Sequence, residues 1–233
     1  MVTIKKGACM ILKMHLLLDI IEMNPDVYSL LKLCPYEILR KIHVKRFEDG
    51  EFELEQGEIY QYMYIIVEGR VNVYSESENG KKYFLCCSQS GDLIGEMEIF
   101  QQVPYISYVK GVGDIIALEI DKDTLLSWMA LDQNFSSLFI KKICENSYRM
   151  CNRMKRNSLY DLRQRLAYYL LEQFGGKKLA SLQFNSERLS QEMAVTQRSI
   201  NRLLKEFKEK QIIDLGHGKI QLLDHQALTS LLD

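Results

Sequence analysis

The hydrophobic period of this chain changes along its length, and this change constrains the fold more than any other feature. Between about residues 44 and 121 the apolar residues alternate, and the segment MYIIVEGRVNVYSE at 63–76 is rich in β-branched and aromatic side chains. This pattern is typical of half-buried strands. From Asp123 the apolar residues recur at helical spacing, with no Pro or Gly in 123–158. We therefore expect an α+β chain in which a β module precedes a series of helices.

Turn-forming residues divide the β module into many short strands. Asn79-Gly80 supplies the positive φ of a tight hairpin turn, and glycines recur between the other strand segments. Short strands in this number and spacing predict a closed barrel or jelly roll. We place this β-barrel sensor domain at 41–122, after an N-terminal helical segment at 1–40 that Pro25 and Pro35 interrupt.

A long helix is expected at 123–157. A seam of small and apolar residues follows the a/d spacing of a coiled coil, namely Ile140, Cys144, Ser147, Cys151 and Met154. Such a seam on a helix that leaves a finished barrel favours a parallel homodimer contact. The alternative is that the helix packs against its own barrel.

The last segment, 158–233, has the pattern helix, turn, helix and hairpin. Asn157 or Ser158 is expected to cap a helix that ends at Phe174, before Gly175. Asn185 or Ser186 caps the first helix of the pair, and Thr196 caps the second. A hairpin around 216–218 and a short helix complete the chain. A helix-turn-helix followed by a β-wing is a DNA-binding arrangement.

Polar residues on the second helix of the pair are suited to the major groove of DNA. Glutamine and arginine can form paired hydrogen bonds to adenine and guanine, and later basic residues meet phosphates. A solvated basic face would account for Lys208 and Lys210, but not for the combination of turn, cap, apolar face and wing. The predicted DNA-binding residues are Thr196, Gln197, Arg198, Ser199, Asn201, Arg202, Lys205, His217 and Lys219.

The distribution of charge agrees with a chain of two functional parts. The formal net charge is -1, but residues 44–133 hold 7 basic and 17 acidic residues. Residues 141–165 hold 8 basic residues and only 2 acidic ones. An acidic module joined to a part that meets a polyanion gives this asymmetry, although a chance scatter of surface charge is the alternative.

Three motifs resemble the CRP/FNR superfamily of bacterial transcription regulators. They are GDLIGEMEIF at 91–100, YDLRQRLAYYLL at 160–171 and LSQEMAVTQRSINRLLKEFKEKQII at 189–213. The resemblance covers nearly everything from about Phe47. It implies a cyclic-nucleotide-binding-like jelly roll, a long dimerisation helix and a winged helix-turn-helix. The implied partners are a second copy of the chain, a palindromic operator in double-stranded DNA, and RNA polymerase.

The recognition helix departs from the family pattern at one position. Many members carry Glu two positions after the equivalent of Thr196 and Arg four positions later, where this chain has Arg198 and Arg202. A Glu accepts a hydrogen bond from cytosine, whereas an Arg donates to guanine. We therefore expect an operator that differs from the common TGTGA-like half-site.

The sensor departs from the family pattern as well. Members that bind cyclic nucleotides carry an Arg-Ser or Arg-Thr pair shortly after the Gly-Glu turn, and this chain has Tyr105 or Ile106 there. Neither side chain can pair with the phosphate, and burying that anion without a cation costs roughly 2–5 kcal/mol. We do not expect cAMP or cGMP to bind. A small apolar or aromatic effector, thiol sensing by Cys144 and Cys151, or no ligand at all remain open. The predicted pocket residues are Gly95, Glu96, Tyr105, Ile106, Tyr108, Met150 and Cys151.

Other classes of function find little support in the residues. The six cysteines form no CxxC pair, and the four histidines are scattered, so no metal site and no cofactor are expected. No catalytic motif is present, so we do not expect an enzyme. The chain is too large to need a disulfide framework, so the cysteines are expected to be reduced thiols of a cytoplasmic protein. No apolar run reaches the roughly 18–20 residues that cross a membrane. The alternative to a transcription regulator is a cyclic-nucleotide-binding module of a signalling assembly.

Overall fold

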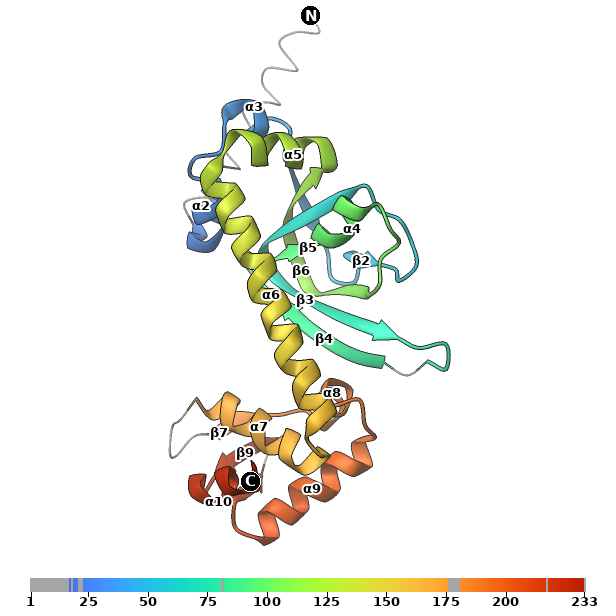
Figure 1. Ribbon diagram of the computed structural model, residues 1–233, viewed down its shortest axis with the longest axis vertical. Helices are drawn as coiled ribbons and strands as arrows, with labels where there is room; N and C mark the ends of the chain where they lie inside the picture. The colour runs from blue at the N-terminus through green and yellow to red at the C-terminus, as the bar shows by residue number, and fades with distance from the viewer. Residues whose placement is uncertain are drawn as a thin grey trace, which may run out of the picture. The chain divides into compact units, whose positions relative to one another are not determined.

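The computed structural model describes residues 17, 19–20, 23–80, 82–175, 181–216 and 218–232 (Figure 1). The chain forms two compact units, which we describe separately. The first comprises Met1–Lys81 and Leu85–Glu145, and the second comprises Lys82–Phe84 and Asn146–Asp233. Most of the helical pattern predicted before Pro25 lies outside the described residues.

Between residues 25 and 39 two short helices precede the sheet, and a proline lies at the start of each. In α2 (Pro25–Leu31) the proline occupies the first helical position, where its missing N–H is not needed. In α3 (Tyr36–Leu39) the N-cap is Pro35. The inner face of α2 joins the core formed with Trp128 and Phe135. The prolines that interrupt the helical pattern therefore mark where helices begin.

The sheet of the first unit confirms the predicted β module. Its hydrogen-bonded order is β1-β6-β3-β4, with β2 paired to β6 and β5 paired to β3. The two longest strands, β3 and β6, pair antiparallel over most of their length, with register shifts between residues 66 and 70. The strands are β1 (His43–Phe47), β2 (Glu53–Leu54), β3 (Tyr62–Glu76), β4 (Lys82–Ser88), β5 (Leu93–Ile94) and β6 (Tyr108–Asp121).

Aromatic side chains fill the inner core of this unit. Phe52 packs edge-on against Tyr64 with ring centroids 5.2 Å apart, and Tyr60 packs in the same way against Tyr105 at 5.1 Å. Both contacts belong to one buried cluster. Edge-to-face pairs contribute about 0.5–1.5 kcal/mol beyond their buried area. The interior between the strands is therefore packed with the chain's own rings.

The segment expected to form a single helix at 123–157 forms two helices. They are α5 (Lys122–Leu131) and α6 (Gln133–Leu159), separated by Asp132 with φ -124° and ψ 97°. The buried carboxylate of Asp132 accepts from the Phe135 N–H at 3.0 Å and from Trp128 Nε1 at 3.2 Å. A side-chain cap therefore starts a new helix without any glycine or proline.

The second unit begins with α7 (Leu162–Phe174), and its cap differs from the expected one. Asp161, rather than Asn157 or Ser158, is the N-cap, and it forms a reciprocal capping box with Gln164. A capping box satisfies two free N–H groups at once, which no residue at 157 or 158 can do for a helix starting at 162. The helix ends at Phe174 as predicted, with Gly175 as its C-cap.

The helix pair, the hairpin and the last helix follow the expected order, whereas the strand before them, β7, was not predicted. These elements share one core with α7. β9 lies between β7 and β8 in a three-stranded antiparallel sheet. No described helix of the chain is long and apolar enough to cross a membrane. The elements are β7 (Ser181–Gln183), α8 (Ser186–Glu192), α9 (Gln197–Glu209), β8 (Ile213–Gly216), β9 (Lys219–Leu222), α10 (His225–Thr229) and η1 (Ser230–Leu232).

Candidate functional site

The helix α9 has one buried face and one exposed polar face. Its buried residues are Ile200, Leu203, Leu204 and Phe207, and they form the apolar face that the sequence predicts. They pack into the core of the second unit. The exposed face carries Gln197, Arg198, Asn201, Arg202 and Lys205. Five of the nine predicted DNA-binding residues thus share one surface of one helix.

The start of α9 is fixed by its own cap and by the preceding turn. Thr196 Oγ1 accepts from the Ser199 N–H at 3.2 Å, and the two hydroxyl oxygens lie 2.9 Å apart. In the turn, Ala194 adopts a left-handed conformation with φ 52°. A side chain at positive φ costs about 1 kcal/mol or more, and here it sets the angle between α8 and α9.

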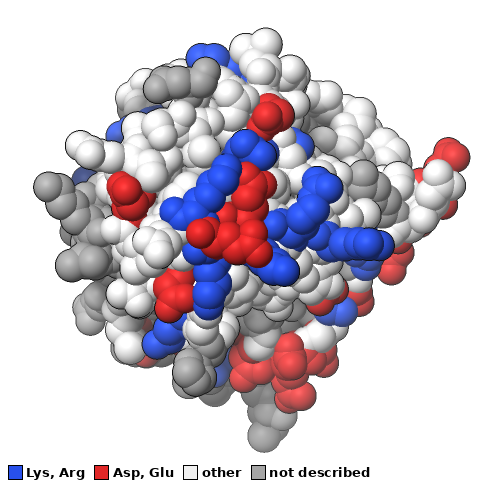
Figure 2. All heavy atoms as spheres, turned by 90° about the horizontal axis from the view of Figure 1, so that it is seen from below, with Lys and Arg blue, Asp and Glu red and all other residues white. Residues whose placement is uncertain are grey.

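The charges along α9 differ between its two halves. In the second half Lys205 pairs with Glu209 at 3.7 Å, and Lys210 pairs with Glu206 at 2.9 Å. The hydrogen bond from Lys210 lowers the pKa of the Glu206 carboxyl. Figure 2 shows Lys and Arg side chains gathered around a group of acidic ones on this end of the molecule.

In the first half of α9 the basic side chains are less constrained. Arg198 and Arg202 are exposed, and neither forms an ion pair within 4 Å among the described residues. Their guanidinium groups are planar forks of N–H donors with no acceptor capacity. The N-terminal half of α9 therefore carries basic side chains without a close ion pair, although the charge of Arg202 also acts on Glu206.

Lys219 is the predicted DNA-binding residue that the structure describes in the wing. Lys219 is exposed at the start of β9, opposite Gly216 of β8 and Gln183 of β7. His217 lies outside the described residues. On the neighbouring strand, Asp214 pairs with Lys208 of α9 at 2.9 Å, and the Lys208 hydrogen bond lowers the pKa of Asp214.

One contact near this face was not predicted as part of the site. Gln197 Nε2 donates to Ser186 Oγ at 2.6 Å, which links the first residues of α8 and α9. The sequence suggested Ser186 only as an alternative helix cap, and Asn185 is the cap, accepting from the Glu187 and Arg188 N–H groups. The contact between Ser186 and Gln197 depends on how the two helices pack, so the sequence alone gives no signal for it.

In the sensor unit, two predicted pocket residues meet at the Gly-Glu turn. Gly95 has φ 81°, and a Cβ built on it would lie 1.9 Å from Tyr105 Oη. Tyr105 is only 3% exposed, and its hydroxyl has no hydrogen-bond partner among the described residues. Burial is the main cause that raises its pKa. The phenol therefore fills the space directly over the Gly-Glu turn.

Glu96, the next residue, is mostly buried at the start of α4 (Glu96–Gln101). Burial raises its pKa to about 7, and the negative charges of Glu98 and Asp92 act in the same direction. Desolvation penalises the carboxylate more than the neutral acid. This side chain therefore titrates close to neutral pH.

The other predicted pocket residues differ in exposure and in the unit to which they belong. Ile106 is 57% exposed, and Tyr108 is half-buried in β6. Met150 and Cys151 belong to the second unit, where both are exposed on α6. No groups of three or more potential metal ligands occur among the described residues. Within the sensor unit, Gly95 and Tyr105 are the predicted pocket residues that lie against each other.

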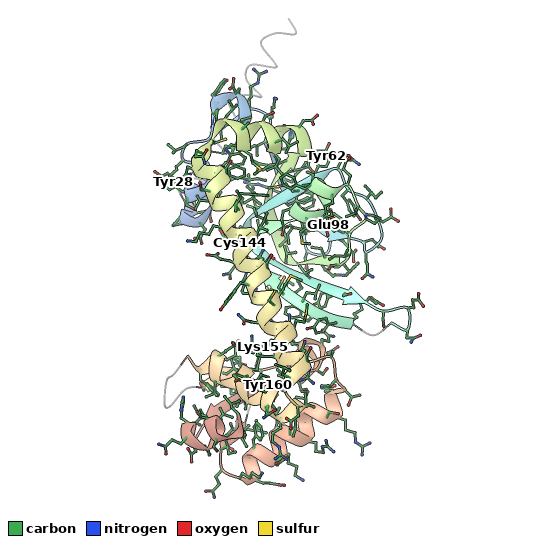
Figure 3. The ribbon with its side chains drawn as sticks, viewed as in Figure 1. Tyr28, Tyr62, Glu98, Cys144, Lys155 and Tyr160 are labelled. Carbon is green, nitrogen blue, oxygen red and sulfur yellow. The ribbon has the colours of Figure 1, made fainter. Side chains whose placement is uncertain are left out.

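A separate cleft of about 270 Å³ lies in the sensor unit. Its walls come from residues 59–62, from α4 and from the junction of β6 with α5. Two of the lining residues, Tyr62 and Glu98, are labelled in Figure 3. None of the seven predicted pocket residues lines it. The cleft is thus distinct from the Gly-Glu turn.

Comparison with known proteins matches both units to described families. Residues 44–132 match the cyclic nucleotide-binding domain, and residues 164–231 match the Crp-like helix-turn-helix domain. A CRP-like cAMP-activated global transcriptional regulator of Mycobacterium tuberculosis is 24% identical over 189 residues, or 78% of this chain and 84% of that protein. An anaerobic regulatory protein of Bacillus subtilis is 24% identical over 216 residues, or 88% and 90% of the two chains.

A solved structure supports the same assignment at the level of the fold. A CooA mutant from Carboxydothermus hydrogenoformans has a TM-score of 0.73 at 18% identity, and the match covers 88% of this chain and 94% of that one. The first family match covers the jelly-roll unit and the first of the three sequence motifs. The second match covers the helix-turn-helix unit, which contains the last motif. The chain therefore belongs to the CRP/FNR family of transcription regulators, with a Crp-like DNA-binding domain.

Proposed function

We propose that this regulator is a cytoplasmic homodimer that places α9 of each subunit in the major groove of a palindromic operator. The observation that carries the proposal is the first half of α9, where Arg198 and Arg202 are exposed without ion pairs beside Gln197 and Asn201. Two such helices meet successive major grooves about 34 Å apart. RNA polymerase, which the family resemblance implies, is the partner that we propose for this step from DNA binding to transcription.

Arg202→Ala should cost about 1–3 kcal/mol of discrimination at one base pair of each half-site, because a bidentate contact to guanine is lost. The operator is first obtained by selection from random DNA, and we expect it to differ from a TGTGA-like half-site. The measurement is the ratio of Kd values for the operator and for a copy changed at that base pair.

A matched control is Lys210→Ala, which removes a basic residue that is already paired with Glu206 at the other end of α9. It should leave the discrimination ratio unchanged. If Arg202→Ala binds operator and random DNA as the wild type does, Arg202 does not contact a base. Selection of a TGTGA-like half-site would contradict the role given to Arg198.

The homodimer is supported by the exposed seam of α6. Ile140 is 54% exposed and Met154 is 65% exposed, and Cys144 and Cys151 between them are exposed as well (Cys144 is labelled in Figure 3). The buried residues of this helix, Phe135, Ser136 and Phe139, precede the seam. A stripe of apolar and small side chains at a/d spacing is stabilised when a second copy covers it.

Oxidation with diamide should link two chains through the α6 thiols. In a parallel dimer, residues at equivalent heptad positions face each other, so Cys144 and Cys151 each meet their counterpart. We expect a covalent dimer on a non-reducing gel that disappears in the Cys144→Ser/Cys151→Ser variant. Cys86→Ser, at an exposed strand position, is the control and should retain the cross-link. If the wild type remains a monomer on this gel after oxidation, the parallel seam is contradicted.

We further propose that the sensor does not bind cAMP. Two observations support this: Tyr105 fills the space over Gly95, and Lys110, the next basic residue after this turn in the sequence, is exposed and pairs with Glu53 at 3.6 Å. An anionic phosphate buried at this turn would have no cation to neutralise it, and that burial costs several kcal/mol.

Calorimetric titration of the purified protein with cAMP should give no heat, and saturating cAMP should leave Tm unchanged. Tyr105→Ala should also fail to bind, because it opens space over the turn but adds no positive charge. Binding by this variant alone would mean that exclusion is purely steric. Micromolar binding by the wild type would contradict the proposal.

A further inference from the structure

We propose that Ser186 is a positioning residue that orients the amide of Gln197, so that this side chain reads adenine in the operator. The inference rests on the proposed function, since it assigns a base to a helix already placed in the major groove. Its observation is separate, namely the hydrogen bond between the two helix starts.

The contact joins residues that their own helices hold in place. Ser186 is the first residue of α8, whose N-cap Asn185 accepts from two backbone N–H groups. Gln197 is the first residue of α9, whose N-cap Thr196 accepts from the Ser199 N–H. Because both backbones are fixed by caps, the 2.6 Å bond from Gln197 Nε2 to Ser186 Oγ selects one arrangement of an otherwise exposed side chain.

The hydrogen-bonding groups that remain on Gln197 determine the base. A glutamine amide has two N–H donors and one carbonyl acceptor, and Ser186 uses one donor. One N–H and the carbonyl oxygen are left. Adenine presents N7 as an acceptor and N6 as a donor in the major groove, which matches this pair. Guanine presents two acceptors, N7 and O6, and the remaining carbonyl would face one of them.

The hydroxyl of Ser186 also keeps a donor of its own. It accepts from Gln197 through a lone pair, so its O–H is free to donate to a phosphate oxygen. The first helix of such a motif crosses the DNA backbone. Ser186 is therefore suited to couple the position of the DNA backbone to the orientation of the Gln197 amide. Preorganising the amide also reduces the rotamer entropy that is lost on binding.

The test compares base preference at one operator position in four proteins. The variant Gln197→Ala first identifies the operator position at which the base preference depends on this side chain. The operator selected by the wild type is then prepared with each of the four base pairs at that position. Kd values are then measured for wild type, Ser186→Ala, Ser186→Thr and the control Ser181→Ala, which makes the same change at an exposed position in β7. Circular dichroism melting confirms that each variant is folded.

We expect the wild type to prefer adenine about 10-fold or more over the other bases at this position, as one bidentate contact provides. Ser186→Ala should lower this preference by about 3- to 10-fold, while preferences at the remaining positions stay unchanged. Ser186→Thr keeps the hydroxyl and should retain most of the preference. Ser181→Ala should behave as the wild type.

Three results would overturn the inference while leaving the proposed function intact. In the first, Ser186→Ala weakens binding equally at all four base pairs, so that the hydroxyl serves only a phosphate. In the second, the wild type prefers guanine at this position, so that the amide is turned and its carbonyl accepts from Ser186. In the third, Ser186→Ala keeps the full preference for adenine. Failure of the proposed function is distinct, because the wild type would then select no operator.

Discussion

Gly95→Ala is expected to lower the free energy of unfolding of the sensor unit by about 3 kcal/mol or more. The new Cβ would lie 1.9 Å from Tyr105 Oη and 3.0 Å from the Tyr105 ring carbon Cζ, so the buried ring would have to move. The positive φ of 81° adds about 1–2 kcal/mol for any residue with a side chain. Urea denaturation followed by the fluorescence of Trp128, the only tryptophan and a buried residue of the same unit, measures the loss.

Gly113→Ala separates the two causes. Gly113 also has a positive φ, 72°, but nothing lies within 4 Å of its added Cβ, so we expect a loss of only about 1–2 kcal/mol. Tyr105→Phe combined with Gly95→Ala should recover part of the loss, since it removes the oxygen in contact. Equal losses at the two glycines would show that Tyr105 does not occupy the space over the turn.

Glu96→Gln is expected to make the sensor unit more stable than the wild type at pH 8, by an amount on the order of 2–3 kcal/mol. Folding raises the pKa of Glu96 from 4.5 to about 7. Between these two values the folded protein holds a proton that the unfolded chain has released. The free energy of unfolding therefore falls as the pH rises from about 4.5 to 7, and glutamine removes this fall.

The measurement is a series of urea denaturation curves between pH 5 and pH 8, again with Trp128 fluorescence. The wild type should lose stability across this range relative to Glu96→Gln, and the two proteins should approach each other at the acid end. Glu78→Gln, at an exposed hairpin position, controls for the loss of one negative charge. A constant difference between Glu96→Gln and wild type at every pH would mean that Glu96 is not protonated in the folded state.

The elements that sequence reasoning predicted well are those specified by local chemistry. The turn, the Thr196 cap and the buried face of α9 all depend on residues within a few positions of one another. The same holds for the end of α7 at Gly175. The change from alternating to helical periodicity predicted the α+β fold because it reflects which face of each element is buried.

The features that the sequence did not reveal depend on contacts made through the fold. The break at Asp132 is one example, because its carboxylate binds the indole of Trp128 as well as capping α6. The contact of Tyr105 with Gly95 is another. The sequence placed either Tyr105 or Ile106 where relatives carry a cation, but the burial of Tyr105 over the turn depends on its backbone bonds to the distant residues Gly57 and Glu58. The bond between Ser186 and Gln197 likewise arises from how two helices pack.

The ion pairs in the second half of α9 bear on how this protein searches a genome. A basic residue that reaches a phosphate releases a counterion from DNA, and this release drives non-specific binding. Lys205, Lys208 and Lys210 already have carboxylate partners, so their contacts with phosphate would exchange one anion for another. Non-specific affinity should therefore be lower, and less dependent on salt, than the number of lysines implies. A regulator of this kind spends less time bound to unrelated DNA, and more of its occupancy is decided by base contacts.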